Sequence, residues 1–83
     1  MKVTVRFFAS LREALGPGET LDLAAGATVG DVRNVLMQRS AGHADALGRA
    51  RALRCALNQD LCDESTPLPD TCEVAFFPPV TGG

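Results

Sequence analysis

The chain of 83 residues contains no tryptophan and no tyrosine, so a tyrosine nucleophile and an indole stacking platform are both excluded. Its three cysteines, Cys55, Cys62 and Cys72, are an odd number and form no C-x-x-C pair. This pattern disfavours a zinc ribbon, a thioredoxin-type redox site and a small secreted domain held by disulfides. We expect buried or half-buried thiols in a reducing cytoplasm, with a reactive thiol as the alternative.

The sequence also lacks a strong excess of positive or negative charge, and it lacks long apolar runs. Eight Lys and Arg against ten Asp and Glu give a formal net charge of −2, and no basic block is present, so no nucleic-acid partner is expected. No apolar stretch approaches the roughly 18 residues that span a bilayer, so no membrane partner is expected. The alternating residues 1–6 do not resemble a secretory signal, which favours a cytoplasmic location.

The length predicts one small domain. Such a domain buries only about 60–65% of the surface of its unfolded chain, which leaves little room for a core and a deep cavity together. We therefore expect a carrier, an adaptor or one subunit of a larger assembly, without an independent active site. The single histidine, His43, has no nearby cysteine or carboxylate pair, so neither a metal site nor a cofactor bound by this chain alone is expected.

Alternating apolar residues predict four strands, and turn residues separate them. The predicted strands are residues 2–8, 19–23, 53–58 and 73–77, with a brief further pairing at 61–62. A short helical turn is expected at 11–15. Thr28 and Asp31 match the capping pattern of a helix start, and apolar residues at spacings of three and four follow, so we predict the main helix at 28–40 with Gly42 as its stop.

Residues 43–51 fit either a short helix or an ordered loop. The order strand, strand, helix, strand, strand requires one main helix to cover one face of a mixed sheet. We therefore predict an α+β fold, a β-grasp (ubiquitin-like) roll at residues 1–77, followed by an extended tail at 78–83.

The tail is the most informative segment. Pro78 and Pro79 end the last strand and stiffen the chain, and the residues after them extend by about 13 Å at most. Gly82 and Gly83 lack side chains, so the tip can enter a narrow site on another protein. The carboxylate of Gly83 could be adenylated there and then accept an amine, a thiol or sulfide. The alternative is an ordinary frayed terminus.

The four phenylalanines divide between core and surface. Phe7 shares its face with Val3 and Val5 and is expected in the core, whereas Phe8 breaks the alternation. One of Phe76 and Phe77 is expected in the core and the other on the uncovered sheet face, where it would form a partner surface with Phe8. Which of the two faces outward is left open.

Four segments, residues 6–16, 56–59, 67–70 and 73–83, carry a resemblance to a known family. Together they resemble the small subunit of molybdopterin synthase, the MoaD family of sulfur carriers. The match covers nearly the whole chain, residues 40–52 are its least diagnostic part, and the last segment is the most specific. The three cysteines are not part of the pattern and remain unassigned.

The resemblance implies a mechanism and a set of partners. An E1-like adenylyltransferase (MoeB-type) would use ATP to activate Gly83, and a sulfur donor protein would convert it to a thiocarboxylate. The tail would enter the large subunit (MoaE-type) and donate sulfur to cyclic pyranopterin monophosphate, forming the molybdopterin dithiolene in a heterotetramer. Gly82 and Gly83 would be the functional tip. The resemblance gives the arm and docking residues as Phe76, Phe77, Pro78, Pro79, Val80 and Thr81.

Two alternatives stay open. One is a related carrier with another client, in thiamine sulfur delivery or in ubiquitin-like conjugation to protein lysines. The other is a passive interaction module whose tail has no chemistry.

Overall fold

The computed structural model describes residues 1–79. The elements of this range, in chain order, are β1 (Lys2–Phe7), α1 (Ser10–Leu15), β2 (Gly18–Asp22), α2 (Val29–Met37), α3 (Ala41–Leu47), β3 (Arg54–Leu57), β4 (Asp60–Cys62) and β5 (Cys72–Phe77). None of the helices described there is long and apolar enough to pass through a bilayer.

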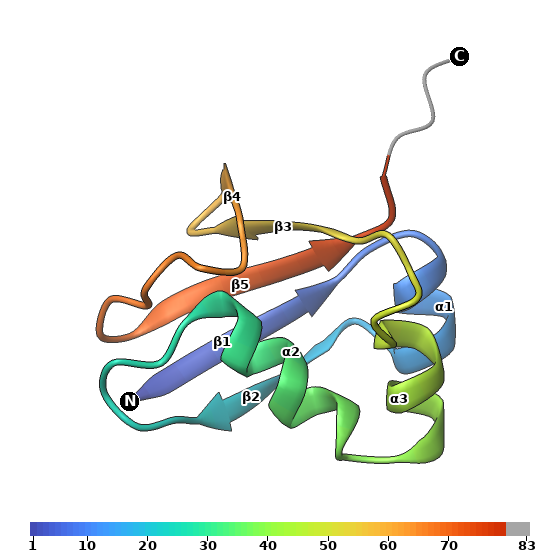
Figure 1. The fold of residues 1–83 in the computed structure, drawn as a ribbon, viewed down its shortest axis with the longest axis horizontal. Coiled ribbons are helices and arrows are strands. Elements are labelled where there is room, and N and C mark those ends of the chain that lie inside the picture. Colours follow the sequence, from blue (N-terminus) through green and yellow to red (C-terminus); the bar gives the residue numbers. More distant parts are fainter. Residues whose placement is uncertain (80–83) are drawn as a thin grey trace.

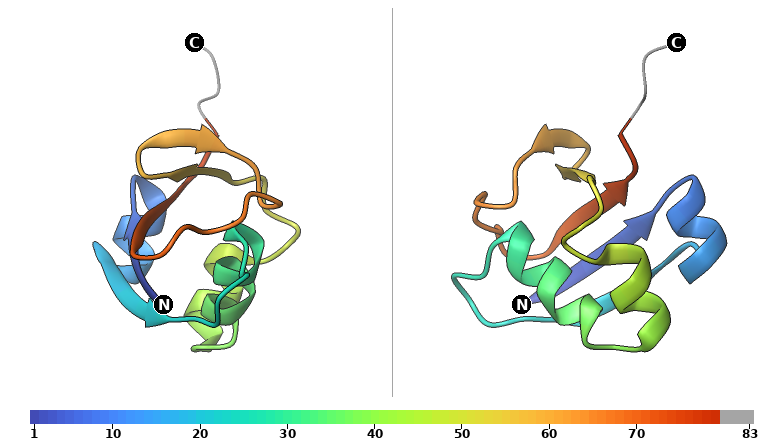
Figure 2. Two further views of the ribbon diagram at one scale, coloured as in Figure 1. Left: turned by 90° about the vertical axis from the view of Figure 1, so that its left-hand side faces the viewer. Right: turned by 45° about the vertical axis from the view of Figure 1, so that its right-hand side comes forward.

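The strands form one mixed sheet in the order β2-β1-β5-β3-β4 (Figure 1). Strands β1 and β5 pair in parallel, whereas the pairings β1–β2, β5–β3 and β3–β4 are antiparallel. Helices α2 and α3 lie on one face of this sheet, and α1 lies at the end where β1 and β5 finish (Figures 1 and 2). The predicted α+β fold, a mixed sheet with its main helix on one face, is confirmed.

The core lies between the sheet and the two helices. The predicted alternation in β1 is confirmed, because Val3, Val5 and Phe7 are buried whereas the residues between them are exposed. The other fully buried apolar side chains are Val29, Val32, Leu36, Leu47, Val74 and Phe76. Burial of a Val, Leu or Phe side chain stabilises a fold by about 1.5–3 kcal/mol, so this cluster holds both helices on the sheet.

The main helix begins as predicted but ends early. The Thr28 hydroxyl accepts a bond from the Asp31 amide (3.3 Å), and the Asp31 carboxylate accepts one from the Thr28 amide (2.8 Å). The helix α2 ends at Met37, because Ser40 caps a second helix by accepting a bond from the His43 amide. Gly42 therefore lies inside α3, and its prediction as the helix stop was wrong.

A buried arginine joins α2 to the end of α3. The Arg33 guanidinium donates to the carbonyl oxygens of Leu47 and Gly48, both at 2.8 Å, and to the Glu64 carboxylate at 2.9 Å. Glu64 also accepts a bond from Arg49. Partial burial acts to raise the pKa of Glu64, but the hydrogen bonds and charges of Arg49 and Arg33 outweigh it and hold that pKa below its usual value.

The hairpin between β3 and β4 turns through two residues with positive φ, Asn58 (48°) and Gln59 (72°). This conformation matches the right-handed twist of paired strands. Asn58 is held in place by β5, because its amide donates to the Glu73 carbonyl (2.8 Å) and its side-chain oxygen accepts from the Glu73 amide (2.9 Å).

Candidate functional site

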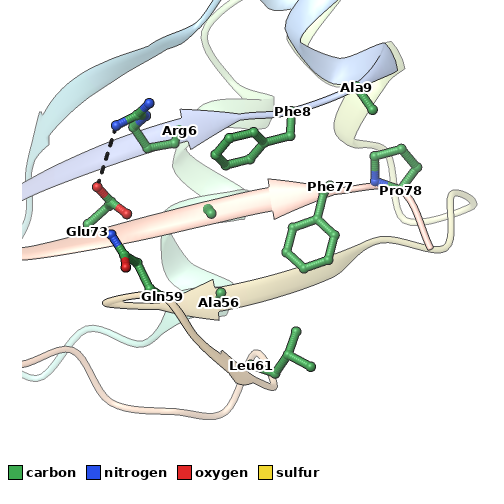
Figure 3. A pocket seen from close by; sticks show the side chains of 10 residues that line it. Arg6, Phe8, Ala9, Ala56, Gln59, Leu61, Glu73, Phe77 and Pro78 are labelled. Carbon is green, nitrogen blue, oxygen red and sulfur yellow. Dashed lines mark ion pairs between the residues drawn. The ribbon is translucent and has the colours of Figure 1, made fainter. Parts of the chain in front are cut away.

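The sheet face opposite the helices carries an apolar depression of about 570 Å³, which we call the sheet-face hollow (Figure 3). Strands β1, β3, β4 and β5 contribute to it, with the turns that follow β1 and β3. Its lining residues are Arg6, Phe8, Ala9, Ala56, Gln59, Leu61, Glu73, Ala75, Phe77 and Pro78.

The register of the sheet explains the depression. Ala75 in the central strand β5 faces Ala56 on one side and Arg6 on the other. Both alanines are small, so the floor of the hollow is low. Larger side chains stand around it, since Leu61 faces Ala56 from the edge strand and Phe77 lies two residues beyond Ala75 on the same face.

The apolar rim of the hollow is open to solvent. Phe8 is 40% exposed and Leu61 65% exposed, and Phe77 is half-buried. Phe8 is presented by a sharp turn, because Ala9 has a φ of 54° and directs the chain into α1. Exposed aromatic and aliphatic side chains gathered around a depression are typical of a surface that binds another protein.

Charged side chains occupy one side of the hollow. An Arg6 nitrogen lies 3.7 Å from a Glu73 carboxylate oxygen, and the Arg6 guanidinium carbon lies 5.8 Å from the centre of the Phe8 ring. Both contacts are exposed, so each contributes at most about 1 kcal/mol to stability. They orient Arg6 along the rim, where it can pair with an acidic group of a partner.

The predicted docking residues divide into three groups. Phe8, Phe77 and Pro78 meet at the hollow, and the exposed Pro79 follows without lining it. The prediction of Phe76 as a docking residue was wrong, because its side chain is 1% exposed and belongs to the core. The remaining predicted residues, Val80, Thr81, Gly82 and Gly83, lie outside the described residues.

Sequence reasoning missed the hairpin side of the hollow, formed by Ala56 and Leu61. For Leu61 the sequence pattern predicts only a brief strand pairing at residues 61–62. Its position opposite Ala56 puts it on the outer face, and the half-buried Cys62 next to it turns inward. The signal was present in the sequence, since the turn at residues 58–59 fixes which residues of the two strands face each other.

The only histidine makes structural contacts. Its ring nitrogens lie 2.8 Å from the Ser40 hydroxyl and 2.9 Å from the Glu19 carboxylate. The contact with Glu19 joins α3 to β2. Ser40 is also the cap of α3, so the three side chains serve the packing of that helix. Within residues 1–79, no group of three or more His, Cys, Asp or Glu side chains could hold a metal ion.

Comparison with known proteins gives a consistent result. The ThiS family model matches residues 5–83. The "Molybdopterin synthase sulfur carrier subunit" of Escherichia coli is 43% identical over 81 residues, covering 98% of this chain and 99% of that protein. The protein of the same name from Mycobacterium tuberculosis is 36% identical, covering 100% of this chain and 99% of its own length.

Solved structures show the same fold. A chain from the complex of subunits 1 and 2 of molybdopterin-converting factor from Helicobacter pylori has a TM-score of 0.70 and 31% identity, with both chains fully covered. The small archaeal modifier SAMP1 from Haloferax volcanii has a TM-score of 0.79 and 25% identity, again with both chains fully covered. These ubiquitin-like neighbours agree with the β-grasp topology of the sheet.

Proposed function

Because this chain belongs to the ThiS family and is a MoaD-type sulfur carrier, we propose that it carries sulfur on Gly83 and donates it as the small subunit of a molybdopterin synthase. The observation that carries the proposal is the identity of 43% to a curated carrier subunit over 98% of the chain. The family match extends over the tail to Gly83.

In the proposed reaction, a carboxylate oxygen of Gly83 attacks the α-phosphorus of ATP in the active site of an E1-like enzyme, and pyrophosphate leaves. Sulfur from a donor protein, delivered as sulfide, then attacks the acyl-adenylate and displaces AMP. The product is a thiocarboxylate, a sulfur nucleophile at the end of the tail. This sulfur would displace an oxygen substituent of cyclic pyranopterin monophosphate and form a thioester, which water would then cleave to return Gly83 as a carboxylate. A second carrier would supply the second sulfur, giving molybdopterin with its dithiolene.

The sheet-face hollow supports a docking role in this proposal. Its exposed rim residues, Phe8 and Leu61, together with Phe77, would bind the large subunit (MoaE-type), while the tail after Pro79 enters that subunit's pocket. The H. pylori relative occurs in a complex with its second subunit, which supports the same partner here. The activating enzyme (MoeB-type) would dock at the same hollow in a separate step.

The decisive experiment measures mass. The protein is incubated with its activating enzyme, ATP and a sulfur source, and then cleaved before aspartate, which releases the peptide of residues 70–83. We expect this peptide to gain the mass difference between sulfur and oxygen. An unchanged peptide, obtained with an activating enzyme that loads another carrier in parallel, would refute the proposal.

A second candidate function is conjugation to protein lysines, favoured by the similarity to SAMP1. Both functions use an activated Gly83, so they are distinguished by the molecule that reacts with the carrier, which is either the pterin precursor or a protein lysine. Cells lacking this protein should lose molybdoenzyme activity and grow without added thiamine if the first proposal holds. Adducts of the chain on protein lysines, with molybdoenzyme activity intact, would favour conjugation. A requirement for thiamine would instead indicate thiamine sulfur delivery.

A further inference from the structure

Two cysteines face each other on the helix side of the β3–β4 hairpin, away from the sheet-face hollow. Cys55 and Cys62 are register partners. Their sulfur atoms lie 3.7 Å apart, and the Cys55 thiol lies 3.4 Å from the Cys62 carbonyl oxygen, to which it donates. Both are free thiols, as is Cys72.

The backbone geometry of this pair suits a disulfide. Facing residues of antiparallel strands have Cα atoms about 4.5–5.5 Å apart, and disulfides span about 4.4–6.8 Å. The two sulfurs must approach from 3.7 Å to about 2.05 Å, which rotation of the side chains can supply. The strands therefore need no rearrangement for the bond to form.

The two thiols differ in accessibility. Cys62 is half-buried and lies in β4, a strand of three residues at the edge of the sheet. Cys55 is buried, and this burial, with the contact to Cys62 and the nearby carboxylates of Glu64 and Asp63, raises the pKa of its thiol to about 12. A reagent in solution therefore meets Cys62 first.

We propose that Cys55 and Cys62 form a reversible dithiol–disulfide site that reacts with small-molecule disulfides such as glutathione disulfide. The Cys62 thiolate attacks one sulfur of the reagent and displaces one glutathione thiolate. Cys55 then loses its proton, attacks the Cys62 sulfur of the mixed disulfide and releases the second glutathione. Two protein thiols are oxidised, and the reagent is reduced to two glutathione molecules.

The disulfide would restrain one side of the sheet-face hollow. It closes the hairpin across its inner side, while Leu61, next to Cys62, lies on the outer side at the hollow. Oxidation therefore fixes β4 on β3 and holds Leu61 at the rim. We expect slower amide hydrogen exchange in β4 after oxidation, since local opening of an edge strand is suppressed.

The sequence offers a direct test. Cleavage before Asp60, Asp63 and Asp70 places the three cysteines on separate peptides. After treatment of the full-length protein with glutathione disulfide, we expect free thiols to fall from three to one and the peptides of Cys55 and Cys62 to be linked. The linkage should persist in a Cys72→Ser control and vanish in Cys62→Ser.

Three results would overturn the proposal. The first is glutathione retained on Cys62 without closure, and the second is a bond that includes Cys72. The third is three free thiols under conditions that oxidise a reference dithiol. The wild-type peptide map decides among these, so the test does not depend on the folding of any variant. It is also independent of Gly83 and of the proposed sulfur transfer.

Discussion

Phe76 and Phe77 are consecutive residues of β5 whose rings lie on opposite sides of the sheet. Phe76 packs in the core at 1% exposure, and Phe77 lines the sheet-face hollow beside Phe8 (Figure 3). The alternation of a strand produces this division, and it separates a residue that stabilises the fold from one that is available to a partner.

The first prediction uses this pair as its own control. Phe76→Ala should lower the free energy of unfolding by about 3–5 kcal/mol, because it leaves a cavity in the core. Phe77→Ala should cost much less stability and should weaken binding to the large subunit at least tenfold, as for an aromatic residue central to an interface. Urea unfolding and calorimetric titration measure the two effects. Equal binding by Phe77→Ala and the wild type would remove the hollow from the interface.

The second prediction concerns pH. Glu64 has a lowered pKa in the folded protein, so its charge contributes stability above the unfolded pKa, and this contribution is lost as the pH falls through the folded pKa. Glu64→Gln keeps the side-chain shape and removes the charge. We expect this variant to be less stable than the wild type at about pH 7 and the difference to shrink by about pH 3. Urea unfolding across this range measures it, and a constant difference would contradict it.

The third prediction concerns the hairpin turn. Gln59 has a φ of 72°, a conformation that costs a non-glycine residue about 1–2 kcal/mol. Gln59→Gly should therefore raise stability by about 0.5–1 kcal/mol, after the greater freedom of glycine in the unfolded chain is subtracted. Asn58→Ala should lower stability by about 1 kcal/mol, because the bond to the Glu73 amide is lost. Thermal unfolding compares both variants, and a destabilised Gln59→Gly would be the contrary result.

The fourth prediction concerns the tail. One residue added after Gly83 should abolish molybdopterin formation, because the activated carboxylate would no longer follow two glycines. A bulky side chain at Gly82 should also block activation on steric grounds. The melting temperature should stay unchanged in both, which distinguishes lost chemistry from lost folding. Retained activity of the extended variant would leave the tail without a chemical role.

The fold could be predicted to a large extent because its strands are half-buried. One buried face produces alternation, and this placed β1, β2, β3 and β5 within one or two residues. The junction of α2 and α3 was harder. A glycine that follows a helical pattern ordinarily ends the helix, but here Ser40 caps a second helix and Gly42 lies inside it. The local sequence allows both arrangements, and packing against the sheet decides between them.

Some residues that line the sheet-face hollow were among those predicted. Phe8 was identified because it breaks an alternation, whereas the choice between Phe76 and Phe77 needed the register of β5 against its neighbours. Arg33 in α2 is buried because Leu47, Gly48 and Glu64 supply acceptors from distant parts of the chain, an arrangement that helical periodicity cannot reveal.

The central position of β5 has a consequence for how the molecule is made. Residues 72–77 separate β1 from β3, so before they are synthesised the hairpins β1–β2 and β3–β4 have no common sheet. Their unpaired inner edges would be open to aggregation during that interval. Pairing of β1 with β5 closes a loop of about seventy residues, which makes it a slow step in folding. A ribosome that stalls before Cys72 would thus release a chain without its middle strand, and quality-control proteases would find both edges exposed.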